Sequence, residues 1–242
     1  MSKQTLLAEP YPTAEQWRKI VEQFDSRAIA HKLLLAQIPY VFHTEPLKFS
    51  LFRRAVADAF SVDPSCVYIV GSAMSGRSLK GDEIEKLYSA ENDSDIDTLI
   101  VSEHLFATHV MESLDWVRDA TRGQNDDKGK LKIPKLSEET ISHIYSVSNN
   151  ASAGIWRPDS LPFDAPVTQR FFDRFSKVGL KTLGLQISDD TVAKVAGRIA
   201  RSFDDAVENL AKSIRRLQYE FKNPKDKGSG SKQTKDKPPP KK

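Results

Sequence analysis

The chain has a single cysteine, Cys66, in 242 residues. One cysteine excludes an internal disulfide and a cysteine-based zinc cluster. Long hydrophobic runs are also missing, since no apolar stretch approaches the roughly 20 residues that a membrane-spanning helix needs. The segment from Met1 to Pro10 contains only a three-residue apolar run before Glu9, which is too short for the core of a signal peptide. These absences predict a cytoplasmic protein that does not associate with a membrane.

The positive net charge of the chain comes from its C-terminal end. The net charge is +3, but residues 222–242 contain eight lysines and two aspartates, or +6, which leaves −3 for residues 1–221. The basic pI is therefore weak grounds for a nucleic-acid-binding fold. Because residues 222–242 are rich in Lys, Pro, Gly and Ser, we expect a disordered tail. Two roles stay open for it: binding nucleic acid or an acidic partner, and simply keeping the protein in solution.

Apolar residues at helical spacing predict helices towards both ends of the chain. Thr13 and Gln16 form a capping-box pattern before a helix over 14–38, with a break near Asp25. Further helices are expected over 47–60, 104–118, 168–178 and 189–221, and residues 138–147 fit a helix or a strand equally. Short β-branched and aromatic segments predict strands over 66–70 and 95–101, joined by a loop over 73–94 that has room for a short helical piece.

Asp95 and Asp97 open the second predicted strand. Alternate side chains of a strand point to the same face, so the two carboxylates lie about 7 Å apart on one face while Ile96 points to the other. Carboxylates at this separation repel each other unless a cation lies between them. Mg²⁺ prefers such oxygen ligands, together with the phosphates of a nucleotide. Asp95 and Asp97 are therefore our candidate catalytic and metal-binding residues.

Gly71 and Ser72 follow the first predicted strand. A residue without a Cβ lets the backbone come close to a ligand, and the amides after it can hold phosphate oxygens. Ser72 adds a hydroxyl donor, and Ser75 and Arg77 extend the same small polar loop. We expect Gly71, Ser72, Ser75 and Arg77 to bind phosphates, although for Arg77 an exposed position without a ligand fits the sequence equally well.

The string Val70-Gly71-Ser72, followed by Ser94-Asp95-Ile96-Asp97 and an apolar strand, resembles the signature of the polymerase-beta-type nucleotidyltransferase superfamily. It is also similar to the minimal nucleotidyltransferases of toxin–antitoxin modules and to the oligonucleotide synthases of bacterial antiphage defence. The resemblance covers residues 66–101. It implies a nucleoside triphosphate such as ATP held by Gly71 and Ser72, with Mg²⁺ or Mn²⁺ on Asp95 and Asp97. The implied reaction transfers a nucleotidyl group to a hydroxyl.

The chain departs from this family pattern in two ways. The 22 residues of 73–94 make a longer loop than the compact versions of the signature have. The family usually has a third carboxylate on a later strand, and this sequence offers no clear equivalent. Asp159 is the best candidate, although it lies in a proline-rich segment, and Asp93 fits a turn better than a metal site. The acceptor is left open among a nucleotide, an RNA end and a protein hydroxyl.

We therefore expect an α+β protein with a small mixed sheet. The expected regions are N-terminal helices over 1–62, a nucleotidyltransferase-like core over 63–165, C-terminal helices over 166–221 and a tail over 222–242. The leading function is a Mg²⁺-dependent nucleotidyltransferase, with a role in bacterial defence among its implications. The alternative is a catalytically degenerate module of the same fold, which acts by binding a nucleotide or a protein partner.

Overall fold

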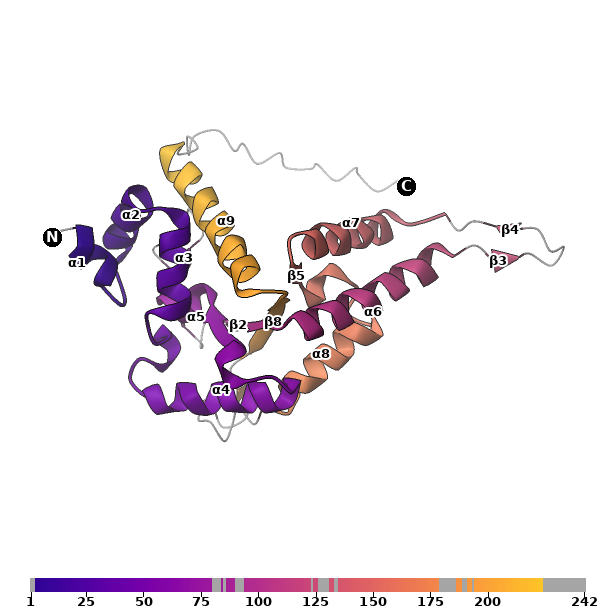
Figure 1. Ribbon diagram of the computed structural model, residues 1–242, viewed down its shortest axis with the longest axis horizontal. Helices are drawn as coiled ribbons and strands as arrows, with labels where there is room; N and C mark the ends of the chain where they lie inside the picture. The colour runs from indigo at the N-terminus through magenta and orange to yellow at the C-terminus, as the bar shows by residue number, and fades with distance from the viewer. Residues whose placement is uncertain are drawn as a thin grey trace, which may run out of the picture.

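The computed structural model describes residues 3–79, 84, 86–89, 94–122, 124–125, 131–132, 135–178, 186–188, 191–192 and 194–223. Within these residues the protein is α+β, as expected, with a small mixed sheet and helices packed against both of its faces (Figure 1). The expected tail lies outside the described residues, apart from Lys222 and Asn223. No helix in the described parts of the chain combines the length and the apolar character needed to cross a membrane.

Three helices open the chain, α1 (Lys3–Ala8), α2 (Ala14–Gln23) and α3 (Ser26–Leu35). The capping box before α2 is confirmed, because the Thr13 hydroxyl accepts from the amide of Gln16 and the Gln16 side chain accepts from the amide of Thr13. Asp25 caps α3 through the amides of Arg27 and Ala28, which confirms the predicted break there. A 3-10 turn η1 (Tyr40–Phe42) then leads to α4 (Pro46–Phe60), which fills the range expected for the second helix.

The sheet has the strand order β1-β2-β8-β5. After the turn η2 (Pro64–Cys66), β1 (Val67–Val70) runs directly into the short helix α5 (Gly71–Ser75) and pairs antiparallel with β2 (Ile96–Val101). On the other edge of β2 lies the parallel strand β8 (Val195–Ala200), with Asp97 opposite Ala196 and Leu99 opposite Arg198. The two-residue strand β5 (Ile155–Trp156) closes the sheet antiparallel to β8.

The helix predicted over 189–221 is wrong in its first part. Residues 186–188 and 191–192 are the short strands β6 (Gln186–Ser188) and β7 (Thr191–Val192), and β8 follows them. Helix α9 (Phe203–Lys222) begins only after Ser202, whose hydroxyl caps it by accepting from the amide of Asp205. The apolar residues of 192–199 fit helical spacing, but pairing along all six residues of β2 makes this segment a strand instead.

The middle of the chain forms an extension of two long helices, α6 (Glu103–Thr121) and α7 (Glu138–Ser152), which lie side by side (Figure 1). The short strands β3 (Gln124–Asn125) and β4 (Leu131–Lys132) pair beyond their ends. The segment 138–147, which fits a helix or a strand from its sequence, is helical. The 3-10 turn η5 (Pro158–Ser160) and α8 (Pro166–Ser176) lead back towards the sheet.

Helices cover the sheet differently on its two faces. On one face, Phe171 and Phe175 of α8 pack with Phe60 of α4 at ring separations of 5.3 and 4.9 Å, directly over Gly197 of β8. On the other face, α9 packs against α3, and the Gln218 amide donates to the carbonyls of Val21 and Phe24. The N- and C-terminal helices are therefore packed together on the face that carries Asp97.

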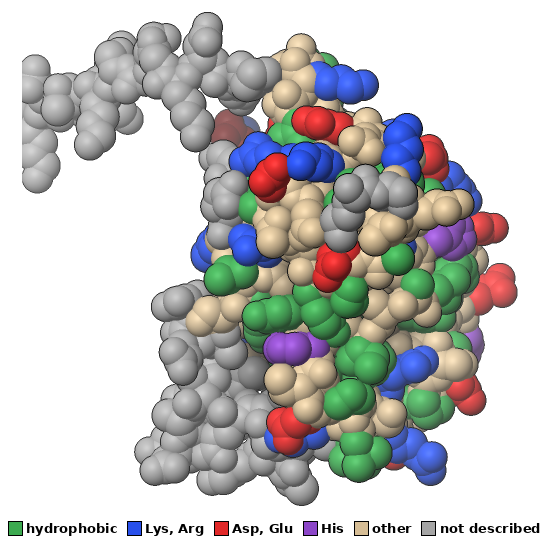
Figure 2. Space-filling model, turned by 90° about the vertical axis from the view of Figure 1, so that its left-hand side faces the viewer, with side chains coloured by type: hydrophobic (Ala, Val, Ile, Leu, Met, Phe, Trp, Pro, Cys, Tyr) green, Lys and Arg blue, Asp and Glu red, His purple; other side chains and the backbone are tan. Residues whose placement is uncertain are grey.

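Figure 2 shows the side of the molecule formed by the N-terminal helices. Hydrophobic side chains are exposed there among charged side chains of both signs. The exposed large apolar residues of α3, α4 and the segment between them are Leu35, Ile38, Leu47 and Leu51. The described residues on this side form no extended basic surface, in keeping with the slight negative charge of residues 1–221.

Candidate functional site

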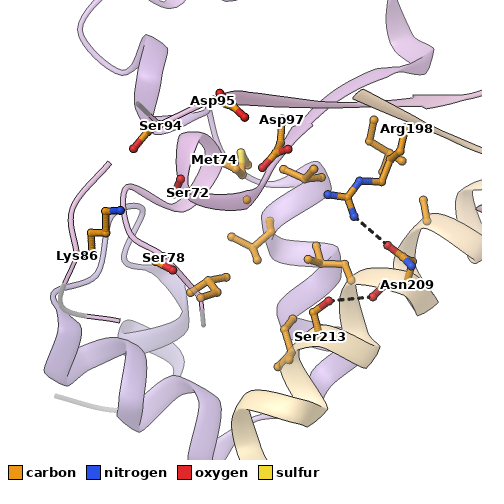
Figure 3. A pocket seen from close by; sticks show the side chains of 18 of the residues that line it. Ser72, Met74, Ser78, Lys86, Ser94, Asp95, Asp97, Arg198, Asn209 and Ser213 are labelled. Carbon is orange, nitrogen blue, oxygen red and sulfur yellow. Dashed lines mark hydrogen bonds between the residues drawn. The ribbon is translucent and has the colours of Figure 1, made fainter. Parts of the chain in front are cut away.

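A cavity of about 370 Å³ lies on the face of the sheet that α9 covers. Its polar wall comes from the ends of β1 and β2 and contains Gly71, Ser72, Ser94, Asp95 and Asp97 (Figure 3). Strand β8, next to β2 in the sheet, adds Arg198, and α9 on the opposite side of the cavity adds Asn209 and Ser213. Between these walls the lining is largely apolar and includes Leu33, Val70, Met74, Leu99, Leu210 and Ile214.

Asp95 and Asp97 both line this cavity. Asp97 lies on β2 and Asp95 directly precedes it, while Ile96 between them is fully buried on the other face of the sheet. In Figure 3 the carboxylate of Asp97 points towards the cavity, and Asp95 lies at its edge. The two acids therefore line one cavity while Ile96 faces away from it, as the alternation of side chains predicts, although the strand begins only at Ile96.

Gly71 is needed for the close approach of α5 to β2. Its φ is +68°, in the left-handed region that glycine adopts without strain. A Cβ at this position would lie 2.5 Å from Oδ2 of Asp97, closer than a Cβ atom comes to a neighbouring atom in real proteins. The sequence predicts that the backbone at Gly71 approaches a ligand. In the structure, the space where its Cβ would lie is bounded by one of the two candidate metal-binding carboxylates. Ser72, the next residue, lines the cavity.

Ser75 and Arg77 are not brought into the cavity wall. Ser75 is 1% exposed, and its hydroxyl lies 3.0 Å from the carbonyl oxygen of Gly71 and 2.7 Å from that of Arg77. This hydroxyl therefore holds the end of α5 rather than facing the cavity. Arg77 forms an isolated antiparallel bridge with Leu87. Of the four residues expected to bind phosphates, Gly71 and Ser72 therefore line the cavity.

The pKa of Tyr88 is affected by the negative charges of the two aspartates. Burial, followed by the charges of Asp95 and Asp97, raises the pKa of Tyr88 to about 12. Its hydroxyl is buried and has no hydrogen-bond partner among the described residues. Tyr88 therefore lies close enough to both carboxylates for their charges to act on it.

Arg198 is the charged residue of the cavity that the sequence did not reveal. It is half-buried on β8 and donates a hydrogen bond to Oδ1 of Asn209 at 3.4 Å. Burial lowers the pKa of Arg198, and the charge of Asp97 is the largest effect that opposes this shift. The prediction of a helix over 189–221 hid its role, because a single arginine on an amphipathic helix fits a solvated face. In a strand, Arg198 and its buried neighbour Ile199 point to opposite faces, and this alternation of a charged with an apolar residue is the sequence signal for a strand here.

Asp159, the candidate third carboxylate, does not line the cavity. It lies in η5, where Arg157 donates to both of its oxygens at 2.9 and 2.5 Å, and its side chain is 63% exposed. Strand β8, next to Asp97, has the sequence Val-Ala-Gly-Arg-Ile-Ala and supplies no acid. Across the described parts of the chain, no three or more His, Cys, Asp or Glu residues are grouped as a metal site would require. Asp93 lies outside those parts.

The donors that remain still fit Mg²⁺. This ion is typically held by one or two carboxylates, while water and substrate phosphates complete its octahedron. Asp95 and Asp97 supply the carboxylates, and the open volume beside Ser72 leaves room for phosphates. A structural zinc site, by contrast, needs four protein ligands of the Cys or His type, which this wall does not contain.

No family model matches the chain, and no curated protein or solved structure is significantly similar to it.

Proposed function

We propose that the protein is a Mg²⁺-dependent nucleotidyltransferase, which transfers a nucleotidyl group from a nucleoside triphosphate to a hydroxyl. The observation that carries the proposal is the convergence of Gly71, Ser72, Asp95 and Asp97 on one cavity. Its volume of about 370 Å³ lies within the range typical of small-molecule sites. Its mixture of apolar lining and a few polar groups suits a ligand with both a base and phosphates.

Each wall has a role in this proposal. The carboxylates of Asp95 and Asp97 hold the cation, and Ser72 with the backbone at Gly71 positions the phosphates beside it. When bound, the cation neutralises phosphate charge and lowers the pKa of a hydroxyl. The apolar lining, including Leu33, Leu210 and Ile214, excludes water and packs against the nucleoside. The acceptor oxygen bonds to the α-phosphorus, while the bond between the α-phosphorus and the oxygen that bridges it to the β-phosphorus breaks. Pyrophosphate leaves with that electron pair, and the hydroxyl proton passes to solvent.

The test is the transfer of label from each α-labelled triphosphate, with Mg²⁺ or Mn²⁺, to a panel of nucleotide, RNA and protein acceptors. We expect transfer by the wild type and its loss in Asp95→Asn/Asp97→Asn, because amides bind divalent cations more weakly than carboxylates. Asp115→Asn/Asp119→Asn is the matched control, since both of these acids are exposed on α6. Full activity in the Asp95/Asp97 double variant would rule the proposal out.

The lack of a third acid on the strand beside β2 favours a second function, binding without catalysis. Among the described residues the cavity has two carboxylates, and the strand beside β2 carries Arg198 where a third acid would suit catalysis. This observation favours a module that binds a nucleotide, or a protein partner, without transfer. It predicts metal-dependent binding of a triphosphate that Asp95→Asn/Asp97→Asn abolishes, with no labelled product from any acceptor. Labelled product that requires these two aspartates would exclude it.

A further inference from the structure

Arg198 has more hydrogen-bonding capacity than its protein neighbours use. A guanidinium presents five N–H donors in a rigid, planar fork. Within the described residues its one hydrogen bond goes to Oδ1 of Asn209, at 3.4 Å, which is long for such a bond. Figure 3 shows the guanidinium beside Asp97 at the edge of the cavity. A half-buried arginine with unused donors at a cavity wall is suited to bind a planar or tetrahedral oxyanion.

The strand order places Arg198 on the opposite side of the carboxylates from Gly71 and Ser72. Strand β2 lies between β1 and β8, so Asp97 has Gly71 on its β1 side and the β8 residues on its other side. A Cβ built on Gly71 would lie 2.5 Å from Oδ2 of Asp97, so the two residues are direct neighbours. The charge of Asp97 also acts on Arg198. A cation held by Asp95 and Asp97 would therefore have two flanks. If the triphosphate lies on the Gly71–Ser72 flank, the second substrate lies on the Arg198 flank.

The two flanks also differ in their chemistry. Lys86 lines the cavity near Ser72 and Ser94, on the side of the triphosphate (Figure 3). On the α9 side, Arg198 is the basic member of the lining, and Asn209 and Ser213 add neutral polar groups. A protein hydroxyl acceptor would leave the Arg198 donors unused in a partly desolvated place, which is costly. An acceptor that carries a phosphate would fill them.

We propose that Arg198 binds a phosphate of the acceptor, so that the acceptor is a nucleotide or a nucleic-acid end rather than a protein side chain. This inference rests on the proposed function, because it assigns the triphosphate to the Gly71–Ser72 flank. Mononucleotides and nucleic-acid ends share the chemistry concerned, a hydroxyl on a sugar that also bears a phosphate. A single mononucleotide and a short oligoribonucleotide distinguish these two sources.

The test is calorimetric titration of the four ribonucleoside 5′-monophosphates, their nucleosides and a short oligoribonucleotide. The titrations are made with Mg²⁺ and a non-hydrolysable triphosphate already bound. We expect at least one monophosphate, or the oligonucleotide, to bind about tenfold more tightly than the nucleosides. Arg198→Met should abolish this difference and Arg198→Lys should retain part of it, because the lysine keeps the charge but loses the fork. Arg216→Met is the control, since Arg216 is exposed on the outer side of α9.

The outcomes separate this inference from the proposed function. Equal affinity for nucleosides and monophosphates, or an unchanged monophosphate affinity in Arg198→Met, overturns the inference even when triphosphate binding depends on Asp95 and Asp97. A larger loss of triphosphate than of monophosphate affinity in Arg198→Met also overturns it, because Arg198 would then serve the donor. If the triphosphate fails to bind, the proposed function fails. The assignment of Arg198 to an acceptor then falls with it, whatever the monophosphates do.

Discussion

At the scale of single residues, Gly71 is where backbone conformation and site geometry depend on each other. Alanine at this position would be strained at φ +68°, and its Cβ would push Asp97 out of place. We expect Gly71→Ala to lower the free energy of unfolding by roughly 1–3 kcal/mol and to weaken Mg²⁺-dependent triphosphate binding. Urea unfolding and calorimetric titration measure the two effects.

Gly154→Ala provides the matched control for this prediction. Gly154 has the same φ of +68°, and its Cβ would meet the carboxylate of Asp205 instead of that of Asp97. Neither Gly154 nor Asp205 lines the cavity. The control should therefore lose comparable stability and keep its triphosphate affinity. Equal loss of affinity in both variants would mean that general destabilisation, and not the displacement of Asp97, causes the effect.

Lys32 on α3 is a buried cation whose pKa predicts a pH dependence of stability. It is 9% exposed, and its Nζ donates to Gln37 at 2.5 Å. Burial, opposed by the charge of Glu9, lowers the pKa of Lys32 from 10.5 to about 8. Between these two values the unfolded chain binds more protons than the folded protein, so stability rises with pH across this window.

We test this with Lys32→Met, which removes the titrating group and keeps the length of the side chain. From pH 8 to pH 10.5 the wild type should gain stability relative to the variant by roughly 2 kcal/mol, a value reduced for the partial solvent access of the ammonium. Denaturant unfolding at closely spaced pH values measures the difference between the two proteins. A constant difference over this range would show that Lys32 has an ordinary pKa.

At the scale of secondary-structure elements, Gly197 distinguishes a strand from a helix over 195–200. In a helix interior, Gly→Ala stabilises by about 1 kcal/mol. In β8 the new Cβ would lie 2.8 Å from the ring of Phe175 and 3.1 Å from that of Phe171. We therefore expect Gly197→Ala to destabilise the protein by roughly 1–3 kcal/mol, as measured by chemical unfolding.

The control compares alanine with glycine at one position within a helix. Lys212 is an exposed residue of α9, so Lys212→Ala should be more stable than Lys212→Gly by about 1 kcal/mol. A gain in stability at position 197, matching that at position 212, would contradict the strand assignment. The sign of the effect decides the question, so the exact magnitude is not needed.

The elements that the sequence predicts best are those defined by local signals. The Thr13–Gln16 capping box, Asp25 and the break between α2 and α3 follow from side-chain-to-backbone hydrogen bonds within three residues. Strands β1 and β2 follow from short apolar runs. Strand β8 could not be predicted in this way, because the partner that makes it a strand lies about 100 residues earlier, in β2. Its own apolar spacing fits a helix equally well.

The same distinction applies to the candidate site. The placement of Asp95 and Asp97 on one face was predictable, because it depends only on the alternation of a single strand. The contribution of Arg198 and Asn209 was not, since it requires β8 beside β2 and α9 across the cavity. Ser75 shows the opposite error. Its sequence context favours a phosphate loop, but its hydroxyl lies against two nearby carbonyl oxygens.

At the scale of the whole molecule, the sheet is assembled from segments far apart in the chain. Strands β1, β2 and β5 fall within 63–165, the expected core, whereas β8 lies at 195–200, in the region expected to be purely helical. The cavity likewise needs Leu33 from α3 and several residues of α9. Helices α3 and α9 are joined further by the ion pairs of Arg27 with Asp204 and Glu208, which are exposed and add little stability. Most of the stability of this contact comes from packing.

This arrangement predicts how fragments of the protein behave. A fragment of residues 63–165 lacks β8, so β2 and β5 lose the strand that joins them, and it lacks α3 and α9, which cover the cavity face. We expect it to show no cooperative unfolding transition and no triphosphate binding. A chain of residues 1–223 keeps every element of the sheet and both helices, so it should match the full-length protein in both measurements. Circular dichroism during urea unfolding and calorimetric titration compare the three. A cooperatively folded, triphosphate-binding fragment 63–165 would show that the cavity does not depend on β8 and α9, and would also remove the structural basis for assigning a substrate contact to Arg198.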